Sequence, residues 1–279
     1  VCAIEDAGFE IRDCIQWLYS TGFPKSHDIS KAIDKKLGAE RNRIKFAQSN
    51  TWREREGRMD RQATIPDNNP VTPEAKQWDG WGTALKPAHE PIVVARKPIS
   101  EKTIAENVLK WGTGGLNIDG CRIGTEEIKT HGKRKGQGVS LEWSKYTSPE
   151  GYEGGIHRGR FPANVILDEE AGRMLDEQHK GASRFFYCAK ASGKERGKYN
   201  NHPTVKPLSL IKHLVSLVTP VGGISLDPFM GSGTHAIACM ELGVNFIGME
   251  KEKNYYEISI RRIEEYKQKQ DEKKNIKGR

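Results

Sequence analysis

The clearest pattern of hydrophobic and polar positions lies in the C-terminal third of the chain. Short apolar runs typical of strands alternate there with segments in which apolar residues recur every three or four positions, as in an amphipathic helix. The predicted strands span 184–189, 223–226 and 245–248, and the predicted helices span 208–218, 234–242 and 252–267. This alternation is typical of a parallel sheet. The predicted fold class is therefore α/β, with a mostly parallel sheet and helices on both faces.

The N-terminal segment shows a weaker form of the same pattern. A helix end at 1–7 runs into a strand at 9–19, and Ser26 is placed to cap a helix that ends at Leu37. Residues 38–73 are charged and have little periodicity, so a loop or mobile insertion is expected there. A short helix at 73–77 and an apolar strand at 90–96 follow.

The middle of the chain is rich in Gly, Lys and Arg. It shows only scattered short elements, which are expected at 103–110, 163–167 and 169–177. These shifts in pattern divide the chain into parts. The predicted boundaries enclose residues 1–97, 98–183 and 184–267, followed by a charged, solvated tail at 268–279.

One segment, GGISLDPFMGSGTHAIACMELGVNFIGME, carries the most specific chemistry. A predicted strand ends at Asp227, the glycines Gly231 and Gly233 allow a sharp turn, and a helix begins near Thr234. The N–H groups at the start of that helix lack helical partners and can bind a ligand. Glu250 ends the next strand, 23 residues after Asp227. An acid at this position can accept both hydroxyls of a ribose.

Spacing alone leaves the ligand open. Gly231-x-Gly233-x-x-Ala236 also fits a loose dinucleotide-binding fingerprint, whereas a Walker loop is excluded because no Lys follows the glycines. Asp227 favours a different ligand, because its carboxylate would repel a pyrophosphate but attract the ammonium group of a methionine moiety. A strand–turn–helix unit that binds no ligand is the structural alternative.

The motif DPFMGSGT resembles the methionine-binding motif of DNA amino-methyltransferases, commonly DPFxGSGTT, with His235 in place of the second Thr. Upstream, HPTVKP at 202–207 resembles the HPTxKP motif that precedes it in the same family. The resemblance implies that S-adenosylmethionine is the cofactor. It implies these binding residues: Thr204, Lys206, Asp227, Pro228, Phe229, Gly231, Ser232, Gly233, Thr234 and Glu250.

The order of the motifs resembles that of the permuted methyltransferases of phages and restriction–modification systems. In these the catalytic motif comes first, and a target-recognition region separates it from the cofactor motif. This resemblance implies a Rossmann-like methyltransferase fold, with 98–183 as the recognition region and 184–267 as the cofactor-binding half. The family's catalytic tetrapeptide, (D/N/S)PP(Y/W), is missing, since the sequence contains no Pro-Pro. We expect it to precede Val1, which would leave this chain without a catalytic residue and inactive alone.

The implied function is site-specific transfer of a methyl group from S-adenosylmethionine to the exocyclic amino group of adenine or cytosine in DNA. A catalytically dead module that binds cofactor and DNA is the alternative, because the tetrapeptide is missing. A nicotinamide-dependent dehydrogenase is disfavoured, because HPTVKP has no place in such an enzyme. No motif specifies a partner restriction endonuclease.

The charge of the chain agrees with double-stranded DNA as a partner. The formal net charge is +8, and a basic surplus suits a polyanion. In the Gly-rich segments THGKRKGQG and GGIHRGRF, lysines can neutralise phosphates and arginines can read guanine edges. The candidate DNA contacts are Lys133, Arg134, Lys135, Arg158 and Arg160. A solvated surface loop is the alternative for each of them.

The remaining composition argues against other kinds of site. The 5 cysteines stand singly, without a CxxC pair, so neither a zinc site nor a disulfide framework is expected. No apolar run is long enough to span a membrane. We therefore expect a soluble protein that is cytoplasmic in a bacterium or a phage-infected host.

Overall fold

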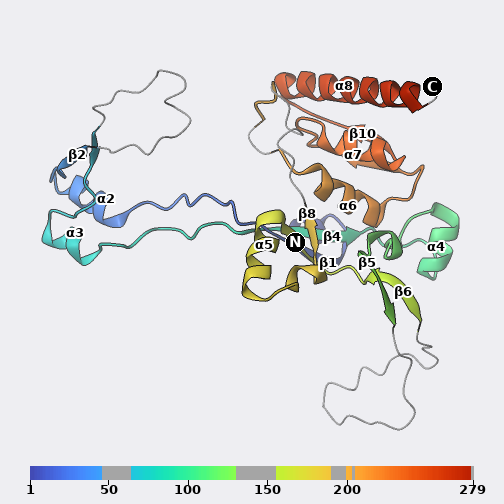
Figure 1. Ribbon diagram of the computed structural model, residues 1–279, viewed down its shortest axis with the longest axis horizontal. Helices are drawn as coiled ribbons and strands as arrows, with labels where there is room; N and C mark the ends of the chain where they lie inside the picture. Colours follow the sequence, from blue (N-terminus) through green and yellow to red (C-terminus); the bar gives the residue numbers. More distant parts are fainter. Residues whose placement is uncertain (46–63, 130–154, 190–198, 203–204, 278–279) are drawn as a thin grey trace, which may run out of the picture. The chain divides into compact units, whose positions relative to one another are not determined.

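The computed structural model describes residues 1–45, 64–129, 155–189, 199–202 and 205–277 (Figure 1). These residues form two compact units. One unit combines Val1–Ser20 with His89–Arg279, and the other consists of Thr21–Ala88. None of the helices in the described part of the chain is both long and apolar enough to cross a membrane.

A four-stranded sheet forms the centre of the first unit. Its strand order is β4 (His89–Arg96), β1 (Glu10–Leu18), β7 (Val165–Asp168) and β8 (Tyr187–Ala189). β1, β7 and β8 run parallel to one another, and β4 is the antiparallel edge strand. The side chains of Ile15, Trp17 and Ile166 extend from these strands into a hydrophobic core, where they are buried. The short helix α1 (Cys2–Asp6) precedes β1.

A second parallel pair, β9 (Ile224–Asp227) and β10 (Asn245–Gly248), carries the Gly-rich motif. Helix α6 (Leu208–Val218) contributes to the core of the four-stranded sheet and to a second core around α7. Its Leu210 and Leu217 join the core of the four-stranded sheet, and Val215 packs with Cys239 of α7 (Thr234–Leu242). Within the described residues, β9 and β10 are not hydrogen-bonded to the four-stranded sheet. The prediction of an α/β fold with mostly parallel pairing is confirmed.

The second unit corrects part of the prediction of a loop or mobile insertion at 38–73. Residues 46–63 of that range lie outside the described residues. Helix α2 (Ile29–Lys36) and helix α3 (Pro73–Gln77) pack together, and the antiparallel strands β2 (Arg43–Lys45) and β3 (Thr64–Pro66) pair between them in sequence. The cap of α2 is Asp28, which accepts from the Lys31 amide. The expected cap, Ser26, instead accepts from the amides of Thr83 and Ala84.

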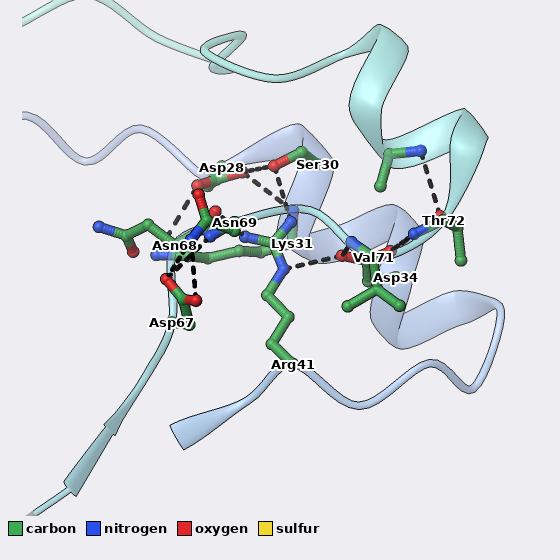
Figure 2. Close-up of polar contacts among 11 residues, drawn as sticks. Asp28, Ser30, Lys31, Asp34, Arg41, Asp67, Asn68, Asn69, Val71 and Thr72 are labelled. Atoms are coloured by element: carbon green, nitrogen blue, oxygen red, sulfur yellow. Dashed lines mark hydrogen bonds and ion pairs between the residues drawn. The ribbon is translucent and has the colours of Figure 1, made fainter. Parts of the chain in front are cut away.

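A buried carboxylate joins the parts of this unit (Figure 2). Asp34 accepts hydrogen bonds from the Val71 amide at 3.1 Å, from the Thr72 amide at 3.0 Å and from the Thr72 hydroxyl at 2.8 Å. Arg41 Nε donates to it at 2.8 Å. Burial alone would raise the pKa of Asp34, but these donors outweigh it and hold the pKa well below its usual range.

The central region contains more regular structure than its composition predicts. Helix α4 (Ile104–Trp111) begins with a capping box at Thr103 and is followed by a 3-10 turn at Asp119–Cys121. Strand β5 (Ile123–Lys129) then pairs with β6 (Ile156–Arg160) as an antiparallel ladder. Helix α5 (Glu169–Gln178) and the 3-10 turn Ala182–Phe185 precede β8. The ladder had no signal in the sequence.

The last helix, α8 (Lys253–Lys277), is longer than predicted. The segment expected to be a solvated tail continues the helix as far as Lys277. Its residues 271–275 are exposed, as expected for a solvated segment. The Lys, Glu and Gln residues that dominate this run have good helix propensity, which explains the extension.

Candidate functional site

The predicted site is built where two parallel strands end. In the register of β9 and β10, Asp227 lies opposite Gly248. Asp227 therefore lies at the C-terminal end of β9, next to the C-terminal end of β10, and Glu250 follows two residues after Gly248. The Phe229 amide donates to Asp227 Oδ1 at 3.0 Å, which turns the chain sharply after β9. The two carboxylates thus flank the Gly-rich turn that leads into α7.

Glu250 ties this turn to the end of β10. Its Oε2 accepts from the Gly231 amide and its Oε1 from the Glu252 amide, both at 2.8 Å. The amide of Glu252, and to a smaller extent that of Gly231, lowers the pKa of Glu250 against the effect of burial. Glu250 is therefore held as an anion against the loop.

The glycines of the turn are required by conformation and by space. Gly231 and Gly233 have φ of 55° and 82°, in the left-handed region that side chains disfavour. A Cβ on Gly233 would lie 3.1 Å from the Ser259 side chain, and one on Gly248 would lie 2.0 Å from Met230 Sδ. These glycines let α7, α8 and β10 approach the turn closely.

A buried arginine that the sequence analysis missed holds the turn from behind. Arg262, on α8, donates from Nη1 to the backbone oxygen of Ser232 at 2.6 Å and to its hydroxyl at 2.9 Å. The same nitrogen donates to the Thr234 hydroxyl at 3.2 Å. The side chains of Ser232 and Thr234, predicted to bind the cofactor, are thus buried and face this arginine. No sequence motif marked Arg262, because it lies outside the Gly-rich segment on an otherwise polar helix.

The HPTVKP motif contacts the site through its first residue. His202 packs on Tyr255 of α8, with ring centroids 4.4 Å apart, and its Nε2 lies 2.9 Å from the position of a Cβ on Gly231. Lys206 lies elsewhere: its Nζ forms an ion pair with Glu90 of β4 at 2.6 Å and lies 5.1 Å from the centre of the Trp17 ring. Thr204 lies outside the described residues. The motif therefore links the turn to the four-stranded sheet.

The outer surface of the turn is apolar and open. Phe229 is 86% exposed, and Pro228 beside it is also exposed. Ile224, Leu226, Ile247 and Met249 are exposed on the strands and just beyond them. An aromatic ring next to two carboxylates can contact a planar apolar group while the acids bind polar ones.

The predicted DNA contacts divide into two groups. Lys133, Arg134 and Lys135 lie outside the described residues. Arg158 and Arg160 lie on strand β6, which corrects the expectation that both are in a loop. Arg160 is paired with Glu126 and stacks over Phe185, whereas Arg158 is exposed and forms no ion pair within the described part of the chain.

Comparison with known proteins identifies the family. Residues 1–261 match a family described as DNA methylase. The chain belongs to this family. The match includes β9, β10 and the Gly-rich turn between them, so the resemblance drawn from DPFMGSGT and HPTVKP is confirmed.

Relatives within the DNA methylase family match different shares of the chain. The type II methyltransferase M.HindIII of Haemophilus influenzae is 27% identical over 265 residues, which is 94% of this chain and 58% of that protein. The DNA adenine methyltransferase YhdJ of Escherichia coli is 39% identical over 67 residues, 24% of this chain and 23% of that protein. The chain thus spans less than two thirds of the length of these relatives.

A solved structure, that of the M1.HpyAVI–SAM complex, is 21% identical to the chain. The alignment covers 93% of this chain and 65% of that one, with a TM-score of 0.37.

Proposed function

We propose that this chain is the cofactor-binding and DNA-contacting part of a site-specific DNA amino-methyltransferase. The reaction moves a methyl group from S-adenosylmethionine to the exocyclic amino group of adenine or cytosine in double-stranded DNA. The observation that carries the proposal is the placement of Asp227 and Glu250 at adjacent ends of two parallel strands, on either side of a Gly turn at a helix start.

The residues present fit S-adenosylmethionine. Asp227 uses one carboxylate oxygen for the Phe229 amide, which leaves acceptor capacity for the ammonium group of the methionine moiety. Glu250 is held as an anion and has lone pairs left for the ribose hydroxyls. The exposed ring of Phe229 can cover the adenine. When bound, the cofactor supplies an electrophilic methyl group.

The residues of this chain contribute binding and positioning. Asp227 and Glu250 fix both ends of the cofactor, and Arg262 fixes the turn between them, so that little reorganisation is needed at the moment of reaction. A target base inside a duplex must leave the stack before its amino group can react. The tetrapeptide that holds such a base in the family has no counterpart in these 279 residues, which contain no Pro-Pro.

The DNA contact rests on charge and on the family. The net charge of +8 favours a polyanion, and Arg158 is an exposed residue of strand β6. We assign the reading of DNA to residues 98–183. Within this range Val165–Asp168 form β7 of the four-stranded sheet, so the DNA-contacting part is the segment before β7, which contains the β5–β6 ladder. Lys133, Arg134 and Lys135 belong to this proposal on sequence grounds alone.

Titration calorimetry with S-adenosylhomocysteine tests the cofactor site. Asp227→Ala or Glu250→Ala should each cost roughly 1.5–3 kcal/mol of binding free energy, because each removes charge-assisted hydrogen bonds. The matched control is Glu252→Ala, whose backbone amide binds Glu250 while its own side chain is exposed. Unchanged affinity in both acid variants would show that the pocket is elsewhere.

A catalytically dead cofactor- and DNA-binding module is the second candidate, favoured by the missing tetrapeptide. The chain by itself should transfer no tritiated methyl group to mixed-sequence DNA, because no other residues are placed to hold a flipped amino group. Turnover above background would rule out the dead module and would require another base-binding element within the chain.

A further inference from the structure

His235 occupies the first turn of α7, directly behind the Gly-rich loop, and it is the residue at which this chain departs from the DPFxGSGTT pattern. Its side chain is 11% exposed. A polar side chain at this depth needs hydrogen-bond partners. The groups that surround its two ring nitrogens connect it to the predicted cofactor site.

One ring nitrogen is anchored in the core. Nε2 lies 2.7 Å from Ser225 Oγ on β9 and 3.4 Å from Cys239 Sγ, one helical turn further along α7. Because the strand and the helix both hold this edge of the ring, the imidazole has little freedom to rotate. The opposite nitrogen therefore points in a fixed direction.

The opposite nitrogen faces Asp227. Nδ1 is 3.9 Å from Asp227 Oδ2, and within the described residues it is a buried atom without a hydrogen-bond partner. The other oxygen of the same carboxylate, Oδ1, accepts from the Phe229 amide. The Asp227 carboxylate thus lies between a backbone amide on one side and the imidazole on the other.

We propose that His235 is a positioning residue that sets the orientation and charge of Asp227 for the ammonium group of the cofactor. In this proposal the Ser225 hydroxyl donates to Nε2 and the ring proton lies on Nδ1, facing Oδ2. A neutral imidazole in this arrangement steadies the carboxylate without cancelling its charge. This inference rests on the proposed cofactor site and adds to it a residue that the family pattern does not contain.

The arrangement makes cofactor affinity depend on pH. Burial lowers the pKa of His235 below 6.5, and Asp227 opposes this shift. As the pH falls through that pKa, the imidazolium pairs with Asp227 and repels the incoming ammonium, so affinity falls at low pH. Asp227 and Cys239 are the titratable groups around the ring. β10 carries none, Arg262 of α8 engages Thr234, and Lys212 of α6 pairs with Glu241.

The first test compares two variants by calorimetry with S-adenosylhomocysteine at pH 7.5 and pH 5.0. His235→Leu removes both contacts and should weaken binding about three- to tenfold at pH 7.5. His235→Asn can place an amide N–H where Nδ1 stands, without a charge, and should restore binding to within about twofold. The parent should lose more affinity than His235→Asn at pH 5.0. His202, which lies near Glu250, is present in all three proteins and therefore does not contribute to the difference between them.

The control is His179→Asn, which replaces an exposed histidine at the end of α5. Affinities of His235→Leu and His235→Asn equal to the parent at both pH values would overturn the inference while leaving the cofactor site intact. A parent chain that does not bind S-adenosylhomocysteine would overturn the proposed function and this inference together.

A second measurement needs no ligand. Nuclear magnetic resonance titration of the His235 imidazole should give a lower pKa in Asp227→Asn than in the parent, because the variant removes the carboxylate that favours the charged ring. An unchanged pKa would show that the two side chains are not coupled. This result decides the inference even if His235→Leu fails to fold.

Discussion

Two regions of the molecule are organised around aspartates, and the use of their oxygens differs. Asp34 in the second unit has a side chain that is 2% exposed, and both its oxygens are taken by Arg41, Val71 and Thr72. Asp227 has a side chain that is 25% exposed and accepts one backbone hydrogen bond. A carboxylate with every lone pair engaged holds structure together, whereas one with spare acceptors can bind a ligand.

The largest expected effect is a loss of folding in the second unit when the Asp34 carboxylate is removed. Asp34→Ala should unfold the second unit, because it leaves the buried Arg41 guanidinium unpaired and frees the amides of Val71 and Thr72. Hydrogen exchange should show loss of protection in α2 and α3. Asp67→Ala, which removes a half-buried carboxylate bonded to Asn69 in the same unit, is the control. Retained protection in Asp34→Ala would mean that packing of α2 on α3 suffices.

The same carboxylate predicts how this unit responds to acid. The pKa of Asp34 is depressed in the folded state, so its stabilising effect is fully present above the pKa of an unfolded aspartate and is lost as the pH falls through the lower folded value. Protection of α2 should therefore persist at pH 4. Loss of protection between pH 6 and pH 4 would contradict the depressed pKa.

A smaller effect on stability is expected from removing Arg262, the buried arginine that holds the Gly-rich turn. Arg262→Ala removes three hydrogen bonds to Ser232 and Thr234 and should lower the free energy of unfolding by about 1.5–3 kcal/mol in urea titrations. Its neighbour Arg261, whose side chain is 62% exposed, gives the matched variant Arg261→Ala, which should cost less than about 1 kcal/mol. Equal costs would mean that the turn does not depend on Arg262.

The smallest expected effect is a difference between Arg158 and Arg160 of β6 in the salt dependence of DNA binding. Arg158→Ala should reduce the slope of log affinity against log salt for duplex DNA by about one unit, as expected for one lost phosphate contact. Arg160→Ala should change the slope less, because Arg160 is already paired with Glu126 and stacked on Phe185. Fluorescence anisotropy across a salt series measures both. A larger change in slope for Arg160→Ala would mean that Arg160, and not Arg158, contacts the DNA phosphate.

The sequence predicted the parts of this molecule whose signals are local. Periodicity located α6, α7 and β10 to the residue, and DPFMGSGT placed Asp227 and Gly231 on the turn before α7. From HPTVKP, Thr204 and Lys206 were expected near the cofactor, whereas the residue of this motif that lies against Gly231 is His202, to which no role had been assigned.

Contacts between distant residues could not be predicted in this way. Asp34 meets Val71 across 37 positions, and Arg262 meets Ser232 across 30. Neither pair leaves a pattern in a local window. The β5–β6 ladder was missed because its strands are polar and Gly-containing, so the alternation that identifies a half-buried strand is weak.

A crystal structure of the chain with S-adenosylhomocysteine would show whether Asp227 and Glu250 bind the cofactor. The ammonium nitrogen should lie within hydrogen-bond distance of Asp227, the ribose hydroxyls should lie on Glu250 and the adenine should lie against Phe229. A ligand bound elsewhere, with Asp227 and Glu250 both facing solvent, would show that the cofactor site is not here.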